Sequence, residues 1–336
     1  MKLLIVTQKV DKTDPILGFF HRWIEEFASH YDHVTVIGQQ TGVHKLPQNV
    51  DVLSLEKEKS RSNLSQIFRF WNIIRSHSND YDCVLVHMTP VWILLGAPLW
   101  ILMRKPMYLW YEIKRGSWKL SASLLFVKKV FAASEHGLPT IAERQKIVGH
   151  GIDIETFIPQ KELREKNHLV AIGRLTRIKH YEVILKALST LPDCRLTIAG
   201  GTITESDKVV ERRLRDLMHR LNIADRVEMG WVSPEEIPTL LQRADCMLHA
   251  SQGGLDKVVL QAMSCGCPVV TVSEAAKDEL PDSCCAEEKT MGDKCKALLS
   301  MSDHDRDILS KDLREIVETE HSLKQCILEI VTQIHS

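Results

Sequence analysis

The chain of 336 residues is 44% hydrophobic, and its 43 Lys and Arg side chains nearly balance 44 Asp and Glu side chains, leaving a formal net charge of −1 at pH 7. A length of this order predicts about two domains. The near-zero net charge excludes the broad basic field of a typical nucleic-acid-binding protein, so we expect no nucleic acid partner.

Nine cysteines are present, without a CxxC pair or an alternating Cys/His spacing that would predict a metal site. Met1 and Lys2 lead directly into an apolar strand, which is not the pattern of a secretory signal. An odd number of thiols without an export signal favours reduced cysteines. Since no apolar run reaches the roughly 18 residues of a membrane-spanning helix, we expect a cytoplasmic protein.

The first half of the chain alternates apolar strands with amphipathic helices, which is typical of an α/β domain with a parallel sheet. Its strands are expected at residues 3–7, 34–37, 52–55, 83–87, 107–111, 130–133 and 146–148. His87 ends one of these strands, and the carboxyl ends of parallel strands line ligand crevices. His87 is therefore a candidate site residue.

Residues 91–103 form an almost unbroken apolar run, VWILLGAPLWILM, in which Gly96 and Pro98 predict a kink or a break. One acid, Glu112, accompanies the basic residues that follow: Arg104, Lys105, Lys114, Arg115, Lys119, Lys128 and Lys129. Residues 91–105, with Trp92 and Trp100, are thus a candidate for peripheral contact with an anionic membrane. They could also line a site for a lipid-phosphate acceptor. The favoured alternative is a buried crossover helix beside a solvated basic loop.

The second half repeats the α/β pattern after a polar, charged linker at 155–167. Its strands are expected at residues 169–172, 196–199, 227–230, 246–250 and 269–272. Three loops that follow strands, at 173–179, 200–206 and 251–257, carry glycine, basic or hydroxyl residues at equivalent places. One crevice at the sheet edge would collect all three loops.

Two features of these loops suit a diphosphate. Arg174 could bind it in forked geometry and Lys179 as a point charge. The helix that starts after Gly253 and Gly254 would present backbone N–H groups to an anion, and Lys257 would add a full charge. The alternative is a solvated basic loop and an ordinary crossover helix.

Several motifs together resemble the GT-B glycosyltransferases, in particular the large retaining family that uses nucleotide-activated sugars (family 4-like, glycosyl transferases group 1). They are Arg174 with Lys179, the turn GWVSPEEI, the segment GLDKVVLQAMSCGCPVV, and the hinge-like GHGIDIETFIP at 149–159. The resemblance implies two Rossmann-like domains with parallel sheets facing a central cleft. Residues 1–158 would bind the acceptor and residues 159–318 the nucleotide sugar, while a helix within 319–336 would cross back to the first domain.

The resemblance also assigns roles to residues. Arg174 and Lys179 match the pair that neutralises the leaving diphosphate, a large catalytic effect, so that neither a metal nor another cofactor is expected. The donor-binding positions that it implies are Gly18, Gly173, Gly200, Gly253, Gly254, Leu255, Asp256, Lys257, Val258 and Gln261.

Two departures from the family pattern weaken the expected catalytic machinery. The family carries two glutamates separated by seven residues where this chain has Gly253 and Gln261. Gln261 can hold a ribose hydroxyl without charge assistance, and Asp256 and Lys257 could replace the first glutamate only in part. A strand-end histidine is also missing, and Glu112 or His87 is the candidate for its catalytic role, with His150 and His21 as further candidates.

These observations predict a cytoplasmic glycosyltransferase, at the inner face of the membrane if residues 91–105 contact lipid. It would move a hexose, with retention, from a nucleoside-diphosphate sugar to a glycan or lipid-linked acceptor in cell-surface polysaccharide or glycolipid synthesis. The main alternative is a nucleotide-sugar-binding pseudoenzyme or subunit. A second alternative is another GT-B activity, such as epimerisation of the sugar nucleotide.

Overall fold

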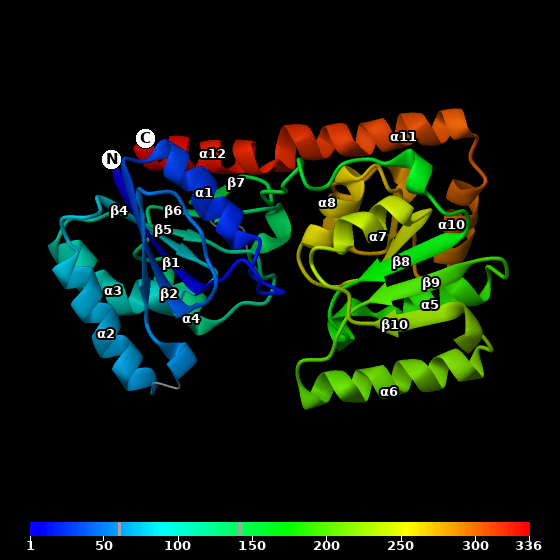
Figure 1. The fold of residues 1–336 in the computed structure, drawn as a ribbon, viewed down its shortest axis with the longest axis horizontal. Helices are drawn as coiled ribbons and strands as arrows, with labels where there is room; N and C mark the ends of the chain where they lie inside the picture. Colours follow the sequence, from blue (N-terminus) through cyan, green and yellow to red (C-terminus); the bar gives the residue numbers. More distant parts are fainter. Residues whose placement is uncertain (60–61, 140–142) are drawn as a thin grey trace. The chain divides into compact units, whose positions relative to one another are not determined.

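The computed structural model describes residues 1–59, 62–139 and 143–336 and divides into two compact units (Figure 1). Unit 1 comprises Met1–Gly151 and Leu323–Ser336, and unit 2 comprises Ile152–Ser322. The observed boundaries differ from the expected ones at 158/159 and 318/319, because both crossing segments are fastened to unit 2. Ile152 donates its backbone N–H to His321 O at 2.7 Å. Phe157 O accepts from Ser264 Oγ at 2.7 Å.

Unit 1 contains a parallel sheet of seven strands in the order β3-β2-β1-β4-β5-β6-β7. The strands are β1 Lys2–Val10, β2 His33–Thr41, β3 Val50–Ser54, β4 Cys83–His87, β5 Met107–Trp110, β6 Lys129–Ala132 and β7 Gln145–Ile147. Side chains of β1 alternate between two cores, with Leu3 and Ile5 on one face and Leu4 and Val6 on the other. This alternation follows from the period of two along a strand, so both faces of the sheet are covered.

Helices cover each face of this sheet, as Figure 1 shows. On one face lie α1 Phe20–His30 and α12 Leu323–His335, and on the other lie α2 Asn63–Ser76, α3 Val91–Leu102 and α4 Trp118–Ser123. The apolar stripe of α12 (Cys326, Ile327 and Ile330 among others) is buried beside α1. The last helix therefore completes the core of unit 1.

The apolar run at 91–103 forms one helix that is buried on one face. α3 continues as a single helix through Gly96 and Pro98, so the break that was expected as an alternative to a kink is absent. Its Trp92 and Trp100 are buried, as the favoured alternative predicts, so these side chains cannot reach a lipid surface. The physical reason is that these indoles pack into the core of unit 1, whereas Ile101 and Leu102 at the end of the helix are exposed. At Gly96 a Cβ atom would lie only 2.2 Å from the Trp100 ring, so this glycine accommodates the buried indole.

Unit 2 contains a parallel sheet of five strands in the order β10-β9-β8-β11-β12. The strands are β8 His168–Ile172, β9 Arg195–Ala199, β10 Val227–Gly230, β11 Cys246–His249 and β12 Val269–Thr271. The helices are α5 Tyr181–Ser189, α6 Glu205–Arg220, α7 Ile237–Arg243, α8 Lys257–Ser264, α9 Glu274–Lys277, α10 Met291–Leu299 and α11 Asp303–Ile316. The chain moves outward from β8 to β10 and then returns to place β11 beside β8. This reversal is a topological switch point, where open α/β sheets bind ligands. In the part of the chain that the structure describes, no helix combines the length and apolar character needed to cross a bilayer.

Candidate functional site

The loops after β8 and β11 lie side by side at the switch point of unit 2. The two strands are paired, with Cys246 opposite Leu169 and Met247 opposite Val170. Gln252 donates its backbone N–H to Ile178 O at 2.9 Å, which joins the two loops directly. Two of the three loops that were expected to converge are therefore adjacent.

Two glycines allow the loop after β8 to approach the loop after β9. Gly173 has φ +141°, a conformation that side chains rarely adopt. A Cβ at Gly200 would lie 2.0 Å from Gly173 O, so position 200 has no room for a side chain. Tyr181 at the start of α5 donates its hydroxyl to Gly173 O at 2.5 Å. These contacts fix the peptide that leads to Arg174 and Lys179.

Lys179 lies at the centre of a hydrogen-bonded chain that joins both loops. Its Nζ contacts Asp256 Oδ2 at 2.5 Å, and the same oxygen contacts His249 Nε2 at 2.9 Å. His249 Nδ1 contacts Thr271 Oγ1 at 3.0 Å, and Thr271 Oγ1 accepts from Ser273 N at 3.1 Å. A carboxylate only accepts hydrogen bonds, so His249 donates from Nε2 to Asp256 and accepts from Thr271 at Nδ1. Every donor in the chain therefore meets an acceptor.

The electrostatics of Asp256 follow from these contacts. Burial by itself raises the pKa of a carboxyl group, but the Lys179 ammonium and the His249 hydrogen bond outweigh it and lower the pKa of Asp256 far below its usual value. The side chains of Lys179 and Asp256 are 18% and 23% exposed. Asp256 is therefore ionised and Lys179 is already paired with an anion.

The remaining residues of this region surround that ion pair. Asp256 is the N-cap of α8, and Lys257 and Val258 form its first turn. Leu255 is buried, whereas Gly253, Gly254 and Gln261 are partly buried. Arg174 is exposed on the loop after β8.

Gly253 is not required by packing, in contrast to Gly200. The atom nearest to a Cβ at Gly253 would be Ser251 Oγ at 3.5 Å, an ordinary contact distance. A Cβ atom would fit at position 253, so steric crowding does not explain why the family's first glutamate is absent there.

The candidates in unit 1 are engaged in its own structure. His87 is buried at the end of β4, where its ring stacks on Phe20 at a centroid distance of 4.0 Å and Nδ1 contacts Thr7 Oγ1 at 3.1 Å. Glu112 accepts hydrogen bonds from Ala133 N at 2.7 Å and Ser134 Oγ at 3.0 Å. Both side chains thus hold strand ends in place, and their catalytic roles stay predictions.

Three further expectations concern the same unit. At Gly18 a Cβ would lie 2.6 Å from Asp14 O, so the turn before α1 requires glycine. His21 accepts from Lys45 N at 3.1 Å, and the His150 ring lies 5.8 Å from that of Trp110. All three positions have local structural roles.

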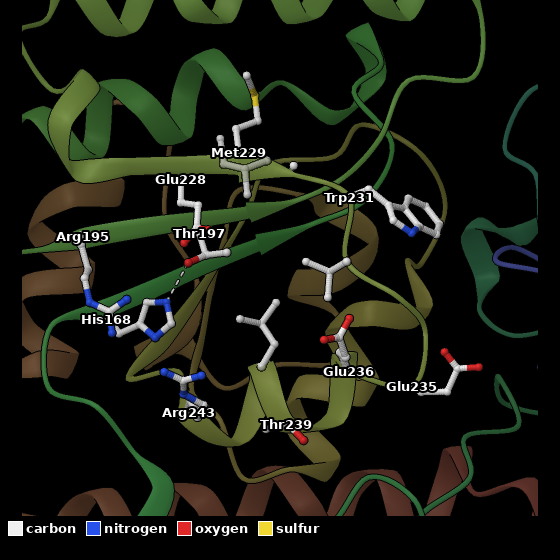
Figure 2. A pocket seen from close by; sticks show the side chains of 14 residues that line it. His168, Arg195, Thr197, Glu228, Met229, Trp231, Glu235, Glu236, Thr239 and Arg243 are labelled. Carbon is white, nitrogen blue, oxygen red and sulfur yellow. Dashed lines mark hydrogen bonds between the residues drawn. The ribbon is translucent and has the colours of Figure 1, made fainter.

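Figure 2 shows the larger cavity of unit 2, about 470 Å³, with the side chains of His168, Arg195 and Arg243 at one end and Trp231 at the other. No residue of the predicted site lines this cavity, which lies between β8–β10 and α7. A second cavity of about 310 Å³ is lined by Leu175, Gly200, Gly201, Thr202, Glu211, Met229, Gly230 and Trp231. The second cavity therefore adjoins the loops that carry the predicted site.

Three residues of this region were missed by sequence reasoning: His249, Tyr181 and Trp231. His249 ends a buried strand, so the rule that selected His87 could also have selected His249. Trp231 lies within the turn GWVSPEEI and is 60% exposed, which is a signal for a binding residue. Nothing in the local sequence indicates the contact of Tyr181 with Gly173.

One group of potential metal ligands lies elsewhere in unit 2. Ligand atoms of Glu279, Glu320 and His321 lie within 4.8 Å of one another, and His321 Nε2 contacts Glu279 Oε2 at 3.0 Å. The hydrogen bond between His321 and Glu279 accounts for this cluster.

Two parallel-sheet α/β units of this kind define the GT-B fold, and solved structures share it. Anabaena HepE, solved with UDP and glucose, is 18% identical with a TM-score of 0.79, and 100% of both chains is covered. Sucrose-phosphate synthase from Thermosynechococcus elongatus is 16% identical with a TM-score of 0.80, covering 100% of this chain and 98% of the other.

The second unit also resembles a known family. Residues 153–280 match the model of glycosyl transferases group 1. A D-inositol 3-phosphate glycosyltransferase of Mycobacterium sp. (strain JLS) is 29% identical over 141 residues, which are 39% of this chain and 32% of the relative. The Mycolicibacterium gilvum (strain PYR-GCK) protein of the same name is 31% identical over 143 residues, with the same coverage. The match thus spans about a third of the length of these curated relatives.

Proposed function

We propose that the chain is a glycosyltransferase that moves a hexose from a nucleoside-diphosphate sugar to a glycan or lipid-linked acceptor. Retention of the anomeric configuration and a place in cell-surface polysaccharide or glycolipid synthesis are part of the proposal. The observation that carries it is the position of Lys179 against the start of α8, at the switch point of a unit that matches the glycosyl transferases group 1 model. The names of the relatives support glycosyl transfer, and the UDP bound to HepE supports a nucleotide-sugar donor.

The diphosphate of the donor would lie at the amino end of α8. Backbone N–H groups of the first helical turn point toward this position, and the helix dipole favours an anion there. Lys179 and the exposed Arg174 would stabilise the charge that develops as the bond from the anomeric carbon to the phosphate oxygen breaks. The acceptor hydroxyl would attack the same face, and its proton would leave with the diphosphate. Arg174, Lys179 and the start of α8 would together supply the positive charge in this scheme.

The nucleobase would occupy the cavity beside these loops. Gly200 and Gly201 leave its floor without side chains, and Trp231 offers an exposed aromatic face on which a base can stack.

Thermal shifts test the donor site. UDP-, GDP-, ADP- and TDP-linked hexoses and the free diphosphates are added to the full chain, and a ligand that binds the native state raises the melting temperature. We expect a shift with one nucleotide class, followed by transfer or slow hydrolysis of that donor. Lys179→Met should abolish the shift, whereas Lys186→Met on the exposed side of α5 should retain it.

Removing Lys179 leaves Asp256 without its cation, so Lys179→Met is also expected to melt at a lower temperature than the parent protein. The ligand-induced shift of each variant is therefore compared with its own baseline. Unchanged binding by Lys179→Met would reject the assigned site, and binding without turnover would favour the pseudoenzyme. Donor turnover in the absence of any acceptor would instead favour epimerisation.

The surface formed by α2, α3 and α4 supports a peripheral position at the inner face of a membrane. The buried Trp92 and Trp100 do not contribute, but large apolar side chains are exposed on these helices and just after them: Leu64, Phe68, Trp71, Ile101, Leu102, Trp118, Leu125 and Phe126. α3 packs against both α2 and α4. Basic residues accompany this surface, and residues 113–134 include no Asp or Glu. Apolar and cationic side chains together suit an anionic lipid surface.

A further inference from the structure

We propose that Asp256 is an internal competitor of the donor diphosphate for Lys179, and that His249 and Thr271 hold it in that position. The inference rests on the proposed function and adds a residue that sets how tightly the site holds a diphosphate. It is carried by the chain of hydrogen bonds from Thr271 through His249 and Asp256 to Lys179.

The Asp256 carboxylate lies beside both the start of α8 and the Lys179 ammonium. Asp256 is the N-cap residue of α8, so its negative charge lies close to the helix start, where an anion is favoured, although its side chain makes no capping hydrogen bond. The carboxylate contacts the ammonium that the proposed function assigns to the diphosphate, at 2.5 Å. One internal anion therefore occupies the ammonium and lies beside the helix start.

Hydrogen bonds through His249 hold the Asp256 carboxylate in place. His249 is buried and donates from Nε2 to Asp256 while Thr271 fixes its other ring nitrogen. Because Thr271 in turn accepts from Ser273 N, the imidazole is oriented on both sides. Asp256 thus keeps its hydrogen bond to His249 when Lys179 turns toward a phosphate, and its charge remains in the site.

Asp256 is expected to weaken the binding of a diphosphate to this site. Lys179 must exchange a carboxylate partner for a phosphate partner, and the diphosphate also meets repulsion from Asp256 at close range. Binding is then weaker than the same cation and helix would give alone. The effect applies most strongly to the free nucleoside diphosphate, which carries more charge than the sugar nucleotide, so Asp256 favours release of the product.

Isothermal titration of the full chain with UDP and with inorganic pyrophosphate tests the inference. Asp256→Asn keeps the size of the side chain and an oxygen for His249 but removes the charge. We expect Asp256→Asn to bind both probes about tenfold more tightly than the parent protein. In a Lys179→Met background the same substitution should change affinity much less, because the cation for which Asp256 competes is gone.

Glu287→Gln, which removes an exposed acid paired with Lys277 in the same unit, is the charge-matched control and should leave affinity unchanged. Melting curves without ligand establish that every variant is folded. If a single variant is unstable, the double variant Lys179→Met/Asp256→Asn replaces it, because it leaves neither member of the ion pair charged without its partner. Equal or weaker binding by Asp256→Asn would overturn the inference and leave the proposed function standing. Failure of both the parent and Asp256→Asn to bind either probe would overturn the inference, and the proposed function would fall with it only if the thermal-shift panel of nucleotides is also negative.

Discussion

At the scale of single residues, the pKa of His168 ties stability to pH. Burial, and then the nearby Arg195 guanidinium, lower the pKa of His168 below its ordinary value of 6.5. In the unfolded chain His168 takes up a proton near pH 6.5, whereas in the folded chain it takes up the proton only at a lower pH. The contribution to stability is therefore complete above about pH 6.5 and is lost as the pH falls from there toward the lowered pKa.

We expect the melting temperature to fall between pH 7 and pH 5, with a slope of at most about 1.4 kcal/mol of unfolding free energy per pH unit from this residue. His168→Gln should flatten the profile. His21 is buried and titrates in the same direction, so the difference between variant and parent profiles isolates His168. The exposed His219→Gln provides the control. Parallel profiles for His168→Gln and the parent would contradict the assignment.

Two glycines of the candidate site give opposite predictions. Gly200→Ala places a Cβ 2.0 Å from Gly173 O, a backbone atom that cannot move without the loop. It should lower the free energy of unfolding by about 1–3 kcal/mol. Gly253→Ala meets no atom closer than 3.5 Å and should be neutral or should stabilise by up to about 1 kcal/mol. Urea denaturation of both variants measures the contrast, and equal effects would show that the close approach of the two loops is wrong.

At the scale of helices and strands, much of the fold was predictable from apolar runs. Strands expected at 83–87 and 169–172 correspond to β4 and β8, because fully buried parallel strands are apolar throughout. Of the kink or break expected in α3, the break was wrong, since local preferences at Gly96 and Pro98 yield to packing of the buried face of the helix. This packing depends on the sheet against which the helix lies, so the sequence of the segment alone does not reveal it.

The candidate site was predictable only in outline. Spacing within the loop after β8 singled out Lys179, and the glycines before the next helix singled out the start of α8. Their direct contact depends on the pairing of β8 with β11, two strands far apart in sequence. The hydrogen bond from His249 to Asp256 depends in addition on a side-chain orientation inside a buried core. Sequence patterns therefore located the region, whereas the ion pair emerged only from the three-dimensional arrangement.

At the scale of the whole molecule, the formal net charge of −1 conceals an uneven distribution. Lys114 and Arg115 lie on the loop before α4 and Lys119 in its first turn, while Leu64 and Phe68 are exposed on α2. Anionic lipid attracts each basic residue near its surface by about 1 kcal/mol, and the apolar side chains add interfacial burial. Net charge alone is therefore no guide to membrane contact.

Sedimentation with vesicles decides this point. We expect the protein to sediment with phosphatidylglycerol-containing vesicles, to stay in solution with pure phosphatidylcholine, and to dissociate as salt rises because exposed charges are screened. Lys114→Gln/Arg115→Gln should weaken binding about tenfold or more, and Leu64→Ser/Phe68→Ser should weaken it independently of salt. Ile308→Ser, an exposed apolar residue on α11 of unit 2, serves as the control and should bind as the parent does. Equal binding to both vesicle types would rule out charge recognition. Unchanged binding by the two double variants would show that the contact lies on another surface, since these variants remove both features on which the proposed membrane surface depends.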